Sequence, residues 1–85
     1  MNYTVIVSPR AVRDRRRLPG DIRQRADAAM VALASNPRPH GCLKMTNTEE
    51  WRIRVGQYRV CYLIDDRARR VNVTRIGHRR SVYDP

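Results

Sequence analysis

The chain has 85 residues, which is enough for one domain with a buried core and leaves no room for a second domain. Its 18 Lys and Arg outnumber its 8 Asp and Glu, so the formal net charge is +10, and all but one of the basic residues are Arg. Such an excess is typical of small domains that bind a polyanion: a nucleic acid, an acidic protein or an anionic membrane surface.

The cysteines and the apolar runs exclude several classes of protein. Cys42 and Cys61 form no CxxC pattern and have no histidine at ligand spacing, so we expect two small buried residues, with no disulfide, metal or cofactor. Residues 1–7 hold no basic segment with a long apolar run, and no stretch approaches the length of a membrane span. We therefore expect a cytoplasmic protein without membrane contact.

The first elements are a strand and a helix. Apolar and polar residues alternate over residues 2–7, which predicts a strand, and we expect it inside a sheet. Ser8-Pro9 then supplies a helix cap and a proline at the first helical position. The helix is predicted to run to about Leu18, where Pro19-Gly20 ends it.

A second helix follows at once. Asp21 is expected to cap it, and Asn36-Pro37 ends it. Its apolar stripe, suited to packing on a sheet, consists of Ile22, Ala26, Ala29, Met30 and Leu33. The two helices therefore form a helical hairpin. Residues 37–50 are the least regular segment and are predicted to be a mobile loop, with His40 at the surface and Leu43 and Met45 packed under the sheet.

Residues 51–62 predict a β-hairpin with one apolar and one cationic face. Gly56-Gln57 fits a two-residue type II′ turn, because Gly stands first. The resulting register pairs Trp51 with Tyr62, Ile53 with Val60, Val55 with Tyr58, Arg52 with Cys61, and Arg54 with Arg59. Like charges directly opposite each other in a sheet cost up to about 1 kcal/mol. A bound anion that neutralises Arg52, Arg54 and Arg59 would explain the arrangement.

A polar turn over residues 65–69 leads to a last strand, residues 70–76, which Gly77 is expected to break. The order is thus strand, helix, helix and three-strand meander. This predicts an α+β fold, a mostly antiparallel sheet with the helical hairpin on one face.

The segment after Gly77 brings His78, Arg79 and Tyr83 together. If residues 70–76 pair with residues 58–64, this segment emerges near Arg59, and one concave basic site results. Cations with one or two proton carriers suit cleavage of RNA without a metal. Other interpretations are that His78 is a turn residue, that Tyr83 is a core aromatic and that Arg59 pairs with an acidic side chain.

The segments WRIRVGQYRVCYLID and VNVTRIGHRRSVY resemble the RelE family of the RelE/ParE toxin superfamily, as does Leu43-Lys44 ahead of the Trp. The resemblance implies a microbial-RNase-like single domain over residues 1–85. It further implies a type II toxin that cleaves mRNA in the ribosomal A site by metal-independent attack of the 2′-OH. The implied partners are a RelB-like antitoxin, the ribosome and mRNA, with operator DNA bound only through the antitoxin complex.

Residue by residue, Arg59 and Arg79 match the phosphate-binding arginines of the family, and Tyr83 matches its near-terminal tyrosine. We expect Arg59, Arg79, Tyr83 and His78 to be catalytic, and Arg52, Arg54 and Lys44 to bind RNA phosphates. Arg52 and Arg54 stand where well-studied members carry lysines, and since guanidinium holds its proton firmly their role is expected to be electrostatic.

Two other functions fit the same sequence. One is a ParE-like inhibitor of DNA gyrase, which has this fold and needs no nuclease activity. The other is a noncatalytic module that binds RNA or the ribosome. A catalytic protein needs His78, Arg79 and Tyr83 on the same face as Arg59, whereas a gyrase inhibitor does not.

Overall fold

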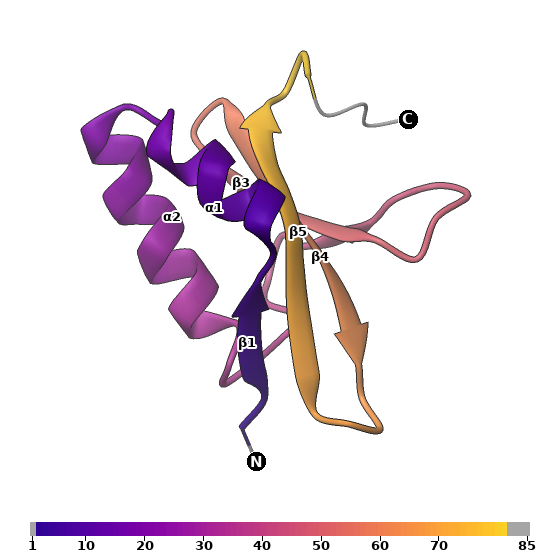
Figure 1. Ribbon diagram of the computed structural model, residues 1–85. Helices are drawn as coiled ribbons and strands as arrows, with labels where there is room; N and C mark the ends of the chain where they lie inside the picture. Colours follow the sequence, from indigo (N-terminus) through magenta and orange to yellow (C-terminus); the bar gives the residue numbers. More distant parts are fainter. Residues whose placement is uncertain (1, 82–85) are drawn as a thin grey trace.

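Two helices and five strands follow one another along the chain (Figure 1). The computed structural model describes residues 2–81. The elements are β1 (Thr4–Val7), α1 (Pro9–Arg16), α2 (Gly20–Ala32), β2 (Leu43–Lys44), β3 (Trp51–Val55), β4 (Tyr58–Asp65) and β5 (Arg70–His78). The predicted α+β class and element order are confirmed, and β2 is added to them. Among residues 2–81 no helix is long and apolar enough to cross a membrane.

The strands form one sheet in the order β1-β5-β4-β3-β2. β1 runs parallel to β5, and the other neighbours are antiparallel. β1 therefore lies at the edge, and the expectation that residues 2–7 lie inside the sheet is wrong. The reason is that β4 and β5 pair with each other as a hairpin, so β5 has one side left for β1, and no strand follows β5 among residues 2–81.

Ser8 joins the first helix to the sheet. Its hydroxyl accepts from the Ala11 amide at 3.2 Å and donates to the Thr74 carbonyl at 3.0 Å, so one side chain caps α1 and fixes it to β5. α1 ends at Arg16, two residues before the predicted end. The predicted cap at Asp21 is wrong: α2 begins at Gly20 after Pro19, and Asp21 lies in its first turn.

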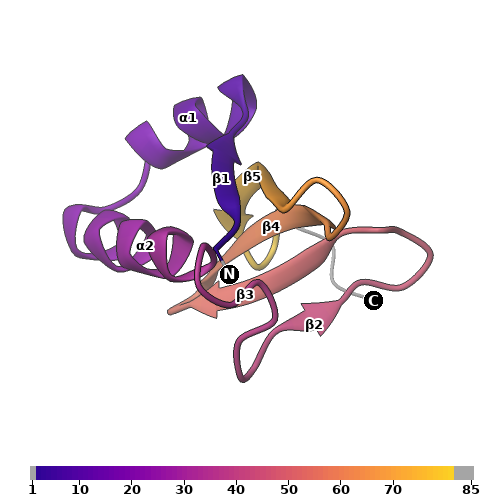
Figure 2. The same cartoon turned by 90° about the horizontal axis from the view of Figure 1, so that it is seen from below.

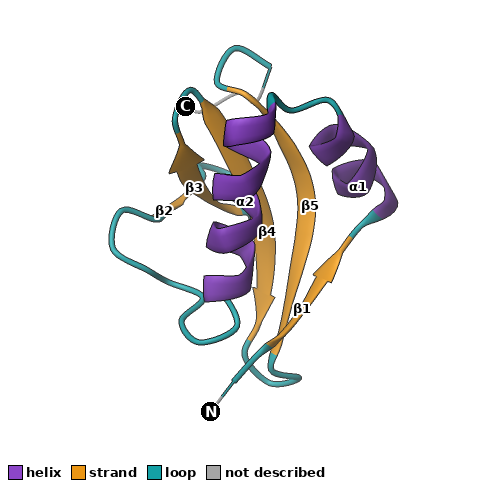
Figure 3. Ribbon diagram, turned by 90° about the vertical axis from the view of Figure 1, so that its left-hand side faces the viewer, coloured by secondary structure: helices purple, strands orange, loops and turns teal. Residues whose placement is uncertain are grey.

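α2 covers one face of the sheet, and the core lies between them (Figure 3). The predicted stripe is confirmed, because Ala26, Met30 and Leu33 are fully buried and the other two members are partly buried. The loop between β2 and β3 projects away from both helices (Figure 2). The helices thus occupy one side of the sheet, and on the other side Met45 of this loop region packs against Cys61.

The β3–β4 hairpin has the predicted register in all five pairs. Gly56 has a φ of +60° and Gln57 is not in the left-handed region, which together define a type II′ turn. Strict alternation and the turn residues were sufficient to predict this element.

β5 continues through Gly77 to His78, so the predicted break at Gly77 is wrong. The backbone there is held on both sides: residues 76–78 pair with β4, and the Ile76 amide donates to Asp14 of α1 at 3.0 Å. These partners are distant in sequence, so the strand end could not be predicted from Gly77 and its neighbours in the chain alone.

The loop over residues 37–50 packs in part as predicted. Met45 is buried against Cys61, whereas Leu43 is 47% exposed, contrary to the prediction. Leu43 lies opposite Arg52 in the outermost strand, where no helix covers it. Cys61 is fully buried and Cys42 only partly so.

Candidate functional site

Arg52, Arg54 and Arg59 lie on the sheet face that points away from α2. In each pair of neighbouring strands the residues that face each other share a side of the sheet, so Arg54, Arg59 and Gly77 form one row. Arg52, Cys61 and Arg75 form the next row. We call this surface the arginine face. The predicted gathering of three arginines is therefore confirmed.

The arginines of this face differ in their exposure. Arg54 is exposed, but Arg52 and Arg59 are only 6% and 7% exposed. Residues buried this deeply have little freedom to reorient, so the two arginine side chains are held in place by the surrounding structure. Such fixed donors are what a developing negative charge requires.

Glu50 adds an acidic group to the arginine face that the sequence did not reveal. Its carboxylate accepts from the Thr74 hydroxyl and from the Arg75 guanidinium, the latter at 3.0 Å. The Met45 amide donates to the Glu50 carbonyl, which closes the loop that buries Met45. Only the fold brings residue 50 to residues 74 and 75, so no local pattern could have predicted the cluster.

His78 does not join the arginine face. It lies opposite Tyr58, and the two rings meet edge to face with centroids 5.4 Å apart. Tyr58 packs against the core on the helix side, so His78 lies on that side too. The expectation that His78 shares a face with Arg59 is therefore wrong, because the strand does not break at Gly77 and the alternation continues for one more residue.

Arg79 and Lys44 lie near opposite ends of β3. The Arg79 amide donates to the Gln57 carbonyl at 2.8 Å, which puts the Arg79 backbone beside the β3–β4 turn. Lys44 lies opposite Trp51, on the helix side, and its ammonium is 3.8 Å from Glu49. It is thus not brought together with the arginines. Tyr83 lies outside the described residues.

A cavity of about 380 Å³ adjoins the arginine face at the free edge of β3. It is lined by His40, Cys42, Leu43, Arg52 and Arg54, among others. His40 is exposed, as predicted, but the sequence did not indicate that it would line a cavity together with Arg52 and Arg54. The feature of the sequence that could have indicated this position is that His40 stands just ahead of the Leu43-Lys44 pair.

The loop that carries His40 is anchored at its base. Arg38 makes two hydrogen bonds to the Asp66 carboxylate, at 3.2 and 2.8 Å, and its guanidinium lies 5.2 Å from the centre of the Trp51 ring. The buried Tyr62 hydroxyl donates to the Pro37 carbonyl at 2.8 Å. These contacts fix where the loop leaves the sheet.

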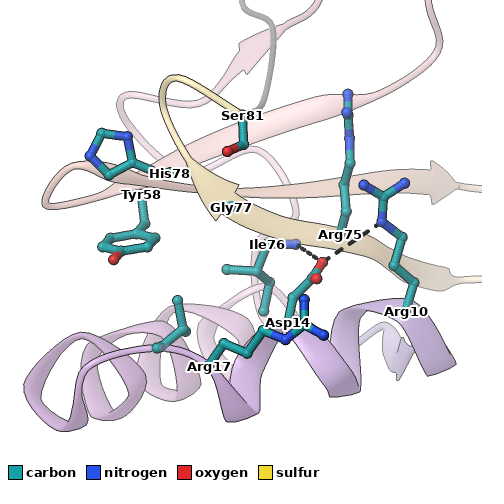
Figure 4. A pocket seen from close by; sticks show the side chains of 10 residues that line it. Arg10, Asp14, Arg17, Tyr58, Arg75, Ile76, Gly77, His78 and Ser81 are labelled. Atoms are coloured by element: carbon teal, nitrogen blue, oxygen red, sulfur yellow. Dashed lines mark hydrogen bonds and ion pairs between the residues drawn. The ribbon is translucent and has the colours of Figure 1, made fainter.

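Two more cavities adjoin the helices. The first, of about 370 Å³, is between α1 and the end of β5 and includes Arg10, Asp14, Arg17, Tyr58, His78 and Ser81 in its lining (Figure 4). We call it the α1–β5 cavity. The second, of about 460 Å³, runs beside β1 and is mostly apolar, lined by Val5, Val7, Val12, Met30, Val31 and the Arg15–Asp27 ion pair. We call it the β1 groove.

Metal ligands are not grouped in the described part of the chain. Within residues 2–81, no three or more His, Cys, Asp or Glu side chains are placed to hold a metal ion.

Solved structures with the same fold come from toxin–antitoxin systems. The RelBE2 toxin–antitoxin complex of Mycobacterium tuberculosis is 29% identical, with a TM-score of 0.79 over 93% of this chain and 100% of that chain. The RelE–RelB complex of Pyrococcus horikoshii is 24% identical, with a TM-score of 0.82 over 93% and 97%. A YoeB/ParE toxin of Agrobacterium tumefaciens is 12% identical, with a TM-score of 0.75 over 88% and 96%. The fold is that of the RelE/ParE toxin superfamily.

The sequence profile of one family, described as the ParE toxin of the type II toxin–antitoxin system parDE, matches residues 5–83. The chain belongs to this family and is a toxin of a type II toxin–antitoxin module. No curated protein sequence matches it.

Proposed function

We propose that this toxin is a ribosome-dependent endoribonuclease that cleaves mRNA in the A site. The observation that carries the proposal is the arginine face, where Arg54 and Arg59 oppose each other although like charges in this position destabilise a sheet. The similarity to a RelBE2 toxin–antitoxin complex at 29% identity supports it. The proposed place of action is the cytoplasm.

The reaction needs charge neutralisation and two proton transfers. The 2′-oxygen of the RNA attacks phosphorus, the bond to the 5′-oxygen breaks, and the products are a 2′,3′-cyclic phosphate and a 5′-hydroxyl. The guanidinium groups of Arg54, Arg59 and Arg79 would stabilise the negative charge on the phosphorane oxygens. Arg52 would hold a neighbouring phosphate, since guanidinium does not give up its proton.

His40 is our candidate for one of the proton carriers. Of the two histidines in the chain, it is the one whose cavity includes Arg52 and Arg54, whereas His78 lies on the other side of the sheet. Imidazole can take the proton of the 2′-OH or deliver one to the 5′-oxygen. Tyr83 stays a candidate for stacking on a base or for proton transfer.

The arginines are tested by measuring the single-turnover rate at which the toxin cleaves mRNA on ribosomes, with the ribosome complexes at saturating concentration. Arg59→Ala and Arg79→Ala are each expected to lower the rate by about 100-fold or more, the loss seen when one fixed donor to a transition state is removed. Arg67→Ala is the matched control, because Arg67 is exposed in the β4–β5 turn at the far end of the sheet. The thermal midpoints of the variants must also be compared with that of the wild type, because Arg59 is buried and a loss of rate must be distinguished from a loss of folded protein.

The ends of the products test the mechanism. Primer extension should find cuts at A-site codons, and the fragments should carry 5′-hydroxyl ends. Full activity of the Arg59→Ala, Arg79→Ala double variant, or 5′-phosphate ends, would overturn the proposal.

His40→Ala is expected to lower the single-turnover rate by about 100-fold, which is the typical contribution of general acid–base catalysis. Added imidazole should restore part of the lost rate if the missing group carried a proton. A rate equal to that of the Arg67→Ala control would remove His40 from the mechanism. Tyr83→Phe separates stacking from proton transfer in the same assay, because it keeps the ring and removes the hydroxyl.

Inhibition of DNA gyrase is the second candidate function, favoured by the description of the matching family as a ParE toxin. Purified gyrase and supercoiled plasmid distinguish the two. Accumulation of cleaved DNA with the toxin, together with intact mRNA on ribosomes, would select the gyrase function.

An antitoxin is the expected partner, since the structural relatives include RelB–RelE complexes. We propose that an antitoxin segment lies in the β1 groove and pairs with the free edge of β1. Val31 on one wall of the groove is 73% exposed, so an apolar side chain there has no cover within the described chain, and β1 is an edge strand. A second, acidic antitoxin segment would cover the arginine face, and operator DNA would be bound through the complex.

Val31→Asp tests this docking site. Loss of one buried valine contact is worth roughly 1.5 kcal/mol or more, so the antitoxin should bind about 10-fold more weakly or worse. Ala68→Asp is the matched control, because it adds the same charge at an exposed position in the β4–β5 turn, outside the β1 groove and the arginine face. Equal affinities of the wild type and the Val31→Asp variant would place the antitoxin elsewhere.

A further inference from the structure

The α1–β5 cavity gathers basic side chains between α1 and the end of β5. Arg10 lies in the first turn of α1 and Arg17 is the C-cap residue, two helical turns further on, so both project from the same side of the helix. Figure 4 shows them below the end of β5, with His78 and Ser81 on the opposite wall. Two elements far apart in sequence thus contribute to one cavity.

The charge of the cavity is positive. Asp14 is its acidic residue, but one carboxylate oxygen already accepts from the Ile76 amide at 3.0 Å and lies 3.9 Å from the Arg10 guanidinium. Arg17 is exposed and makes no ion pair within residues 2–81. Arg75 points away from α1 and binds Glu50, so it supplies no free charge here (Figure 4). The excess comes from Arg17, with Arg10 held in place by Asp14.

The end of β5 adds uncharged donors. Alternate residues of a strand direct their amides to the same edge, so the His78 N–H points in the direction of the Ile76 N–H, toward α1. The Ser81 amide donates to the His78 carbonyl at 2.7 Å, which holds the Ser81 hydroxyl on the wall of the cavity. Guanidinium, hydroxyl and amide donors around one opening are the set that binds a phosphate group.

We propose that the α1–β5 cavity is a second phosphate-binding site, which takes a backbone phosphate of a nucleic acid. It opens toward α1 beside β5, whereas Arg54 and Arg59 project from β3 and β4, so we assign to it a phosphate other than the one cut at the arginine face. Its contribution is to affinity and position, independent of sequence. The site does not depend on the proposed cleavage and would serve equally in a toxin that contacts DNA.

The test uses a short single-stranded oligodeoxynucleotide, which lacks the 2′-OH and so is not cut. Fluorescence anisotropy gives its affinity at several salt concentrations, and each phosphate contact contributes about 0.7 to the slope of log K against log salt. Arg17→Gln should weaken binding and reduce the slope by about 0.7. Arg13→Gln is the matched control, because Arg13 is an exposed residue of the same helix outside the cavity, and its slope should equal that of the wild type.

NMR maps the site with the wild-type chain. The amides of Gly77, His78 and Ser81 should shift on addition of the oligonucleotide, and inorganic phosphate should move the same amides at higher concentration. Equal slopes for Arg17→Gln and wild type, or equal losses for Arg17→Gln and Arg13→Gln, would overturn the proposal. So would binding to phosphatidylglycerol vesicles that is lost in Arg17→Gln while oligonucleotide binding is kept. If the toxin proves not to cleave mRNA, these measurements keep their meaning, because they record binding of an oligonucleotide that is not cut.

Discussion

Asp66 shows how a single residue can connect three segments. Its carboxylate accepts from the Tyr3 hydroxyl at 2.6 Å and from Arg38 at 2.8 and 3.2 Å. The hydrogen bonds to Arg38 and Tyr3 lower the pKa of Asp66 to about 2. The start of β1, the base of the His40 loop and the β4–β5 turn are thereby connected through one side chain.

The pKa of Asp66 predicts a pH dependence of stability. The folded chain binds a proton at Asp66 more weakly than the unfolded chain, so the contribution is present above about pH 4 and is lost as the pH falls toward 2. Denaturant unfolding of wild type and Asp66→Asn should therefore differ at neutral pH, and the difference should close between pH 4 and 2. A constant difference over that range would show that Asp66 does not act through its charge.

The β3–β4 turn shows what one glycine does for an element. Gly56 has a φ of +60°, and a Cβ there would lie 3.1 Å from Ile22 Cδ1 of α2. Gly56→Ala is expected to cost about 1–2 kcal/mol from the left-handed backbone, with the close contact added. Gly20→Ala is the comparison, because its Cβ would meet nothing nearer than 4.0 Å at the start of α2. It should be neutral or slightly stabilising in the same denaturant titration.

Asp14 connects α1 to β5. Removing its carboxylate in Asp14→Ala leaves the Ile76 amide without its acceptor, which is expected to cost about 1–3 kcal/mol. Amide hydrogen exchange is the more specific measurement. In Asp14→Ala the Ile76 amide should exchange faster than in the wild type, and the increase should exceed the one that the loss of global stability causes in the amides of the β3–β4 hairpin. Unchanged exchange at Ile76 would mean that another group takes over.

The elements differ in how far the sequence could predict them. The β3–β4 hairpin follows from alternation and a turn glycine, both local, and its register is confirmed. The end of β5 and the edge position of β1 depend on Asp14 and on the β4–β5 pairing, which join residues far apart in the chain. The same limit applies to the site: the arginine row was predictable, but the side of His78 and the contacts of Glu50 were not.

Charge is a property of the whole molecule. A net charge of +10 on 85 residues repels itself most strongly in the compact state. The thermal midpoint should therefore rise when salt increases from about 0.01 M to about 0.15 M, since the Debye length falls from about 30 Å to about 8 Å. An Arg13→Gln, Arg67→Gln double variant has two fewer charges and should show a smaller rise. A midpoint that falls with salt would show that attractive ion pairs outweigh the repulsion.

The parallel pairing of β1 with β5 sets the order in which the chain can fold during synthesis. Among the described strands Thr4–Val7 pair with Arg70–Val73 alone, so β1 has no partner strand until β5 has left the ribosome. Contacts this distant in sequence are slow to form, because a long loop must close first. Until β5 arrives, α1 also lacks the Thr74 and Ile76 backbone groups that hold Ser8 and Asp14. The five-strand sheet therefore cannot assemble until the β5 codons have been translated.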